Sequence, residues 1–234
     1  MNAKKLQQVA WLGDQWISKP IRGVVLSFHG LNFTALKTQP LPEELGWAQA
    51  GGLVVFPYYR PWNWMNRQAR EMVDEVVDAV YAMYRLKSSV PLVCTGTSMG
   101  GGGALLYARY AKRPVAACLA NVPMCDAAYH FGEREDLPRT FYAAFQGYKE
   151  SLRSLLVEHS PLAQIPQMPR IKYQIVAGDQ DKEVSKRFHA DRMVAAMRKR
   201  KLDVTYIEVP GMEHDGPLPM DVVRRNIDFV ASAW

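Results

Sequence analysis

The sequence predicts an α/β protein in which a mostly parallel central sheet lies between two layers of helices. Six short runs rich in Val, Ile or Tyr recur from about residue 20 onward, each bounded by Gly, Pro or polar residues. Amphipathic stretches of helical length separate these runs. Strands that alternate with helices are typical of a parallel sheet covered on both faces, a three-layer α/β/α sandwich. The length of 234 residues predicts a single domain, 1–234.

The expected strands read as continuous apolar runs, which is typical of strands buried on both faces. We expect strands at 21–28, 52–58, 91–96, 115–122, 171–178 and 203–210. We expect helices at 71–86, 99–112, 185–201 and 219–233. The first eighteen residues add an edge strand or a hairpin.

The helix expected at 71–86 is amphipathic. Its apolar face, which should contact the sheet, carries Met72, Val76, Val80 and Met83.

The interval 124–170 interrupts the alternation of strands and helices. It is nearly fifty residues long and contains the aromatic-rich helical piece RTFYAAFQGYKESLRSLLVEHS. A connection of this length usually carries function or covers a site. We interpret 124–170 as a small cap-like insertion, and a plain crossover helix is the alternative.

Composition and charge exclude several classes of protein. The net charge is +6, but the densest basic run, RKRK at 198–201, ends an expected helix, where cations interact favourably with the helix dipole. We therefore expect no nucleic-acid partner. No apolar run is long enough for a membrane helix, and the N-terminus lacks the apolar core of a signal peptide, which favours a cytoplasmic protein. The oligomeric state is open, and a homo-oligomer is one possibility.

The cysteines and histidines predict neither a disulfide nor a metal site. Cys94, Cys118 and Cys125 are odd in number and form no CxxC pair, and the first two lie in expected strands. The five histidines are scattered without HExxH spacing. We expect reduced core cysteines, no metal and no cofactor.

Residues 96–100 read Gly-Thr-Ser-Met-Gly, between an expected strand and an expected helix. In this context the G-x-S-x-G pattern predicts a sharp turn that exposes the Ser98 hydroxyl above the sheet. Side chains at Gly96 and Gly100 would collide with the turn, and the glycines at 101–103 let the helix begin close to neighbouring strands. The Met99 N–H would face an oxyanion formed at Ser98.

With this motif the chain resembles the α/β-hydrolase family over most of its length, with the insertion after the family's sixth strand. The resemblance implies an acid and then a histidine, each on a loop after a later strand. Asp181, in AGDQDKEV, matches the acid position. Asp179 is the second choice and otherwise a turn residue, and Asp126, one strand earlier, is a further alternative.

His214, in the loop GMEHDGP after the last expected strand, matches the family's histidine position. Its neighbours Glu213 and Asp215 are interpreted as solvated charges. The remaining histidines outside the first loop are interpreted as structural or surface residues: His130, His159 and His189.

The first expected strand ends in FHGLNFT. In the family, the residue after a His-Gly pair donates its N–H to the oxyanion, which implies Leu31 as the second donor. Gly30 would let the loop turn, and Asn32 would add a side-chain contact. His29 would support the loop rather than transfer a proton.

Aromatic residues crowd the loop after the strand expected at 52–58, in YRPWNWMNR. A loop at the carboxyl end of a parallel strand borders the ligand site. We therefore interpret Tyr59, Trp62 and Trp64 as a wall for an apolar, aryl or sugar group, although core packing is the alternative.

The predicted function is that of a serine esterase, which cleaves a small or medium carboxylic ester through an acyl-enzyme. The expected partner is a small-molecule ester. The chain also resembles prolyl-oligopeptidase-like catalytic domains, in the sequences SPLAQIPQMP and GMEH, so a peptidase is the second hypothesis. Those peptidases usually carry an additional N-terminal domain, for which this chain leaves no residues. This difference favours the esterase. Thioester hydrolysis stays open. A relative that binds ligands without turnover is a further alternative.

Overall fold

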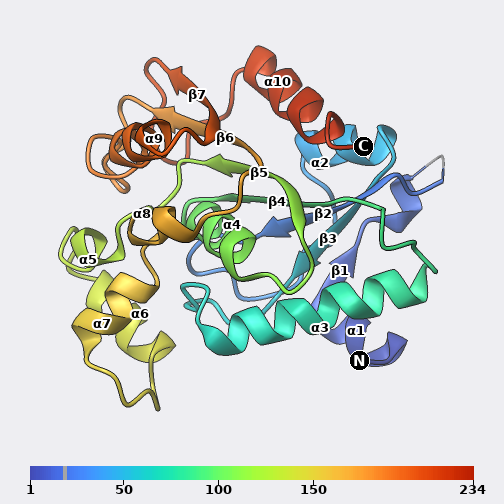
Figure 1. The fold of residues 1–234 in the computed structure, drawn as a ribbon, viewed down its shortest axis with the longest axis horizontal. Coiled ribbons are helices and arrows are strands. Elements are labelled where there is room, and N and C mark those ends of the chain that lie inside the picture. Colours follow the sequence, from blue (N-terminus) through green and yellow to red (C-terminus); the bar gives the residue numbers. More distant parts are fainter. Residues whose placement is uncertain (18–19) are drawn as a thin grey trace.

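A seven-stranded sheet forms the centre of the protein in a computed structural model that describes residues 1–17 and 20–234 (Figure 1). The strand order is β1-β3-β2-β4-β5-β6-β7. β1 runs antiparallel to β3, and the other neighbouring pairs are parallel. The strands are β1 (Ala10–Leu12), β2 (Gly23–Phe28), β3 (Gly52–Pro57), β4 (Leu92–Thr97), β5 (Val115–Asn121), β6 (Lys172–Gly178) and β7 (Asp203–Val209). All six strands expected from the sequence are confirmed, and β1 is the expected N-terminal edge strand.

Long helices connect the strands, and short helices fill the insertion. The α-helices are α1 (Ala3–Val9), α2 (Pro42–Gln49), α3 (Arg67–Met83), α4 (Met99–Tyr110), α5 (Ala127–His130), α6 (Leu137–Ala144), α7 (Leu152–Glu158), α8 (Pro161–Gln164), α9 (Ala190–Lys199) and α10 (Met220–Ala231). Two 3₁₀ turns complete the described elements, η1 (Asp14–Trp16) and η2 (Ile165–Gln167).

The helices cover both faces of the sheet, so the predicted three-layer sandwich is confirmed. One core cluster joins the sheet to α1, α3, α4 and α9, and a second joins it to α2 and α10. Along β2, Val24 and Leu26 belong to the first cluster and Val25 to the second, because successive strand side chains point to opposite faces. Figure 1 shows α10 beside α2, and α3 beside α1.

The buried face of α3 differs from the predicted one. Val73 and Val77 join Val76 and Val80 in the core, whereas the side chain of Met83 is 42% exposed. The helix also begins earlier than expected, at Arg67, because the Asn66 side chain accepts a hydrogen bond from the Ala69 N–H and caps it.

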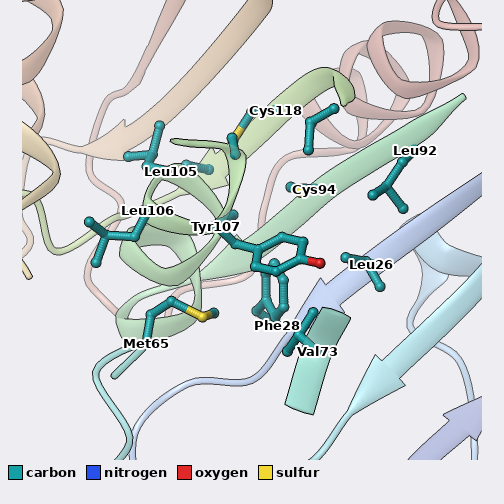
Figure 2. Close-up of a cluster of buried hydrophobic side chains, with 14 of the residues drawn as sticks. Leu26, Phe28, Met65, Val73, Leu92, Cys94, Leu105, Leu106, Tyr107 and Cys118 are labelled. Atoms are coloured by element: carbon teal, nitrogen blue, oxygen red, sulfur yellow. The ribbon is translucent and has the colours of Figure 1, made fainter. Parts of the chain in front are cut away.

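Asp74 lies on the buried face of α3, where Tyr107 of α4 and Lys112 satisfy its carboxylate. The Tyr107 hydroxyl donates to Asp74 Oδ1 at 2.8 Å. Figure 2 shows the Tyr107 ring next to Phe28 in the cluster of buried side chains, and the two ring centroids are 5.6 Å apart. Burial, together with the nearby Asp74 charge, raises the pKa of Tyr107, so the hydroxyl remains a donor. A polar side chain can therefore occupy a core position that periodicity assigns to an apolar one.

The insertion 124–170 forms the short helices α5 to α8, which lie together at one end of the molecule (left in Figure 1). The helical piece expected around 139–160 is two helices, α6 and α7. α6 ends at Ala144, the left-handed Gly147 (φ +89°) lies in the turn that follows, and the Ser151 side chain caps the start of α7.

Cys94 and Cys118 are buried in the core, as predicted, and Cys125 is buried as well. Burial raises the pKa of each thiol. Within the described residues, every helix is too short or too polar to cross a bilayer.

The Tyr107–Asp74 hydrogen bond predicts a stability difference. Tyr107→Phe removes the donor to a buried carboxylate and should lower the free energy of unfolding by about 1–3 kcal/mol. Tyr84 donates to Asp14 Oδ2 at 2.7 Å at a more exposed position, so Tyr84→Phe should cost less than about 1 kcal/mol. Urea unfolding followed by circular dichroism measures both. If both variants lost the same free energy of unfolding, the argument that the buried hydrogen bond contributes more than the exposed one would be contradicted.

Candidate active site

Ser98 occupies a strained turn between β4 and α4. Its φ of 60° and ψ of −123° are unfavourable for a residue with a side chain, and such strain persists only where the surroundings impose it. The Ser98 N–H donates to the Asn121 carbonyl, and the Ser98 carbonyl accepts from the N–H groups of Gly102 and Met124. These bonds hold the serine from both sides, with its side chain in the wall of a cavity. The predicted turn is confirmed.

Close backbone approaches explain the glycines around Ser98. A Cβ at Gly96 would lie 2.3 Å from the Gly100 carbonyl oxygen, and one at Gly100 would lie 2.1 Å from that of Phe28. A Cβ at Gly102 would lie 2.3 Å from the Met124 oxygen. Each contact is with backbone, which cannot rotate away, so these positions accept only glycine without a shift of the sheet or the insertion.

Three residues far apart in the sequence form one hydrogen-bonded chain at Ser98. Ser98 Oγ lies 2.9 Å from His214 Nε2, and His214 Nδ1 lies 2.7 Å from Asp181 Oδ2. The second oxygen of Asp181 accepts from the N–H groups of Glu183 and Val184, both at 2.9 Å. The structure thus brings together the serine, acid and histidine selected from the sequence.

The two other carboxylates weighed for the acid position have different partners. Asp179 Oδ1 accepts from the Gly211 N–H at 2.7 Å and so ties the end of β6 to the loop after β7. Asp126 accepts from the Tyr129 N–H at the start of α5 and pairs with Arg192. Neither is the carboxylate bound to His214.

Two opposing effects set the pKa of His214. Burial disfavours the charged imidazolium, but the hydrogen bond from the ring to Asp181 and the charge of that carboxylate favour it. The charge interactions prevail, and the pKa of His214 is raised above its ordinary value of about 6.5. The imidazole is therefore a stronger base than free histidine and is held in one tautomer.

The loop after β2 places Leu31 and Asn32 in the cavity wall. The Leu31 N–H has no hydrogen-bond partner among the described residues, which leaves it free as a donor, and the Met99 N–H lies in the first turn of α4, where helical N–H groups lack partners. His29 donates from Nδ1 to the Gly30 carbonyl at 2.9 Å, and burial lowers the pKa of His29, so a neutral ring supports the loop as predicted.

The turn of this loop lies at Asn32, not at Gly30 as predicted. Asn32 has a φ of 64°, a left-handed conformation that asparagine tolerates well. A Cβ at Gly30 would meet only the Thr97 oxygen at 3.8 Å and Ser98 Cβ at 4.0 Å. The absence of a side chain at Gly30 therefore keeps space open beside Ser98.

The three aromatic residues predicted as a binding wall separate into three roles. Trp64 lines the cavity, stacks on Phe141 of the insertion at 4.1 Å between centroids, and donates to Thr140 Oγ1. Trp62 does not line the cavity, but its Nε1 donates to Asn32 Oδ1 at 2.6 Å. The prediction for Tyr59 is wrong, because Tyr59 packs in the core against Phe28.

The cavity at Ser98 has a volume of about 850 Å³ and a largely apolar wall. Sequence analysis missed two insertion residues in this wall, His130 and Arg134. His130 was interpreted as structural or surface, yet its buried ring faces the cavity. No local signal marks either residue, because only the packing of the insertion against the sheet brings them near Ser98.

His130, Glu133 and His189 form a buried cluster whose hydrogen bonds do not fit a metal ion. His130 Nδ1 and His189 Nε2 lie 2.7 and 2.9 Å from Glu133 Oε2. His189 Nδ1 accepts from the N–H groups of Cys125 and Asp126, so the ring proton is on Nε2. A metal-bound imidazole carries its proton on the other nitrogen, which here would face two donors. The cluster instead holds the insertion against the loop after Asp181.

Comparisons with known proteins identify the fold alone. No protein-family model matches the sequence, and no curated protein is similar to it. The structure is similar to that of a lipase in its open form (TM-score 0.70, 15% identity, 96% of this chain and 94% of that one). It is also similar to a truncated carbohydrate esterase from gut microbiota (TM-score 0.71, 15% identity, 96% and 89%).

A puromycin-hydrolyzing peptidase of Mycobacterium tuberculosis is similar as well (TM-score 0.71, 16% identity, 92% of this chain and 35% of that one). The chain spans about a third of the length of this peptidase and of a matching acylaminoacyl peptidase. Together with the sheet topology, these similarities show that the chain has the α/β-hydrolase fold. A fold of this kind hosts many activities.

Because Gly100 lies so close to the Phe28 carbonyl, the addition of one methyl group at this position should strongly lower the free energy of unfolding. Alanine favours a helix over glycine by about 1 kcal/mol, but the clash with the Phe28 oxygen should outweigh this gain. Gly100→Ala should therefore lower the free energy of unfolding by about 1–3 kcal/mol or more. Gly30→Ala is the control, with an expected loss below about 1 kcal/mol. Urea unfolding compares them, and an unchanged Gly100→Ala protein would contradict the steric argument.

The hydrogen bond between His214 and Asp181 predicts a measurable titration. The pKa of His214 should lie above about 6.5 and should fall in Asp181→Asn, because the amide no longer stabilises the imidazolium. Asp179→Asn, which removes a carboxylate bound to Gly211 instead, should leave the pKa of His214 nearly unchanged. NMR titration of the ring protons measures all three, and a pKa that does not fall in Asp181→Asn would refute the assigned contact.

Proposed function

We propose that this protein is a serine hydrolase that cleaves a carboxylic ester of small to medium size. The observation that carries the proposal is the hydrogen-bonded chain from Ser98 through His214 to Asp181 at the wall of a cavity. A serine hydroxyl is a weak nucleophile unless a base accepts its proton, and His214 Nε2 is within reach to do so.

In the first half of the proposed reaction, Ser98 Oγ attacks the ester carbonyl while His214 Nε2 takes the hydroxyl proton. Asp181 accepts from His214 Nδ1–H and stabilises the imidazolium that forms. The Leu31 and Met99 N–H groups donate to the tetrahedral oxyanion, and each is worth about 3 kcal/mol in comparable enzymes. His214 then returns the proton to the departing alcohol, which leaves an acyl group on Ser98.

In the second half, water attacks the acyl-enzyme by the same route. His214 takes a proton from the water, and the same two N–H groups stabilise the second oxyanion. His214 then protonates Ser98 Oγ as the carboxylic acid leaves. This chemistry requires only side chains and backbone groups of the described chain.

The cavity supports a small or medium substrate. Its volume of about 850 Å³ lies in the range of small-molecule sites. Leu31, Phe33 and Trp64 give its wall an apolar character that suits an acyl chain or an aryl group. Trp62 contributes indirectly, because it orients Asn32 at the cavity edge.

The insertion 124–170 acts in this proposal as a cap on one side of the cavity. It supplies His130 and Arg134 to the wall. Arg134 also pairs with Glu183, and Glu133 accepts from the Ser185 N–H, so the insertion is bound to the loop that carries Asp181.

A peptidase is the second candidate. Its support is the similarity of the fold to peptidase structures with TM-scores of 0.71 and 0.73. The same residues would serve amide or thioester cleavage, and substrate comparison separates the three. Ligand binding without turnover is disfavoured by the intact Ser98–His214 contact.

The proposal predicts hydrolysis of p-nitrophenyl esters that depends on the three residues. Ser98→Ala and His214→Ala should each lower kcat by about a thousandfold or more, because they remove the nucleophile or its base. Asp181→Asn should lower kcat by at least about a hundredfold. The dependence of kcat/KM on acyl-chain length, from acetate to decanoate, would also show how long an acyl chain the site accepts.

Asp179→Asn is the matched control, because it removes a carboxylate of the same loop that does not touch His214, and it should retain activity. Anilides and thioesters of the same acyl groups, assayed in parallel, test the alternatives. A folded protein that cleaves anilides but no ester would move the assignment to a peptidase. A protein inert on all three, with Ser98 unlabelled by a fluorophosphonate, would refute hydrolysis.

A further inference from the structure

The cavity at Ser98 is acidic although the protein as a whole is basic. Three carboxylates contribute to its wall, those of Glu43, Glu183 and Asp215, against one guanidinium, that of Arg134. Arg134 Nη2 already donates a hydrogen bond to Asp136 Oδ2 at 2.8 Å, and Arg134 also forms an ion pair with Glu183. The net charge of the chain is +6, so the excess of carboxylates over cationic groups in the cavity wall is a local feature. Clefts lined by one sign of charge concentrate ligands of the opposite sign.

Glu43 differs from the other two carboxylates because it is buried. It is 9% exposed and lies in the first turn of α2. Its Oε1 accepts from Asn226 Nδ2 at 2.5 Å, whereas its Oε2 has no hydrogen-bond partner among the described residues. None of the ion pairs formed by those residues includes Glu43.

Glu43 stands where two cavities meet. It lines the cavity at Ser98 and also an adjoining pocket of about 420 Å³. Gly30, Thr97 and Asn121 belong to both walls as well, so the two spaces share a border beside the nucleophile. A group attached to a substrate at Ser98 can therefore reach the carboxylate.

The neighbouring Glu44 shows how this protein satisfies a buried carboxylate that has no ligand to bind. Glu44 accepts from Ser27 Oγ at 2.6 Å and from the Leu41 N–H at 2.8 Å, and it forms an ion pair with Lys37. Lys37 also lines the adjoining pocket, but its ammonium is bound to Glu44. Glu43 receives no comparable set of donors.

Stabilisation of the helix start does not explain the burial of Glu43. An acidic residue in the first turn also stabilises a helix when it is exposed, and Glu44 already caps α2. Burial raises the pKa of Glu43 to about 6; the Asn226 hydrogen bond offsets part of this effect and the Glu44 charge adds to it. Burial therefore disfavours the carboxylate, none of the ion pairs among the described residues supplies a counter-charge, and a cationic ligand would stabilise the ionised form.

We propose that Glu43 binds a protonated amine of the substrate, so that this site prefers esters that carry a cationic group. The inference rests on the proposed function for the ester bond and deepens it by naming the substrate class. An ammonium at the unpartnered Oε2, which is reached from the cavity, would form a charge-assisted hydrogen bond with a largely buried carboxylate. Binding of this kind discriminates strongly against an uncharged group of the same size.

The test uses two pairs of esters that differ only in charge. The p-nitrophenyl esters of 6-aminohexanoate and heptanoate place an ammonium or a methyl group at the end of the acyl chain. The butyrates of 2-(dimethylamino)ethanol and 3-methylbutanol do the same in the alcohol. In at least one pair, kcat/KM should be about ten- to a hundredfold higher for the cation, mainly through KM.

Three variants assign the preference to Glu43. Glu43→Gln keeps the size and one acceptor but removes the charge, so the ratio of cationic to neutral kcat/KM should fall to near one. Glu43→Asp keeps the charge and should retain part of the preference. Glu213→Gln removes an exposed carboxylate that is not in the cavity wall and should keep the wild-type ratio. A ratio is independent of the fraction of active enzyme, so partial unfolding does not obscure it.

Each outcome supports or refutes the inference. A wild-type ratio near one, or a ratio that Glu43→Gln leaves unchanged, would refute it while Ser98-dependent turnover still upholds the proposed function. If no ester is cleaved, thermal unfolding with hexylammonium chloride or 1-hexanol still tests the site. Hexylammonium should raise the Tm more than hexanol in the wild type but not in Glu43→Gln, and equal shifts would refute the inference.

Discussion

The close approach of the start of α4 to the end of β2 is the constraint on which the candidate active site depends. At Gly100 the helix passes so near the Phe28 carbonyl that no Cβ fits between them. This contact fixes the first turn of the helix directly after Ser98, whose φ is 60° and whose Oγ lies 2.9 Å from His214 Nε2. The loop that follows Phe28 brings Leu31 into the wall of the same cavity as Ser98. The strain at one residue is thereby supported by the packing of two elements.

The charged groups of the site follow a second constraint, because a buried charge must be satisfied. Asp181 shows the usual solution, with two N–H donors on one oxygen and His214 on the other. Glu133 accepts from two histidines and the Ser185 N–H, and although its burial alone would raise the pKa, these bonds lower the pKa to about 2. Glu43 departs from this pattern, and the departure occurs where the cavity opens.

The insertion is part of the site rather than an appendage to the fold. Its first residue, Met124, donates its N–H to the Ser98 carbonyl and approaches Gly102. Its acidic and basic side chains contact the loop after Asp181. Because the same segment touches the nucleophile turn, the acid loop and the cavity wall, a change in its packing would be felt at all three.

The sequence by itself determined the sheet strands, four of the helices that cover them, and the turn at Ser98, because buried strands read as apolar runs and Gly96 and Gly100 mark a turn whose sterics are local. It did not predict α1 or α2, and it pointed to Asp181 and His214 only through the resemblance to a family. Only the tertiary structure decided where Tyr59, His130 and Glu43 lie. Tyr59 and Trp64 lie in one aromatic loop, yet one packs in the core and the other lines the cavity.

The physical reason is that burial and partners are properties of distant contacts. Asp74 lies on the core face of α3 because Tyr107 of α4 and Lys112, which follows that helix, supply its partners. Glu43 and Glu44 are adjacent and chemically identical, but Lys37 and Ser27 reach only the second. Local periodicity carries no information about which side chain from another element will contact a given position. The residues that line the cavity are therefore defined only when the layers are packed together.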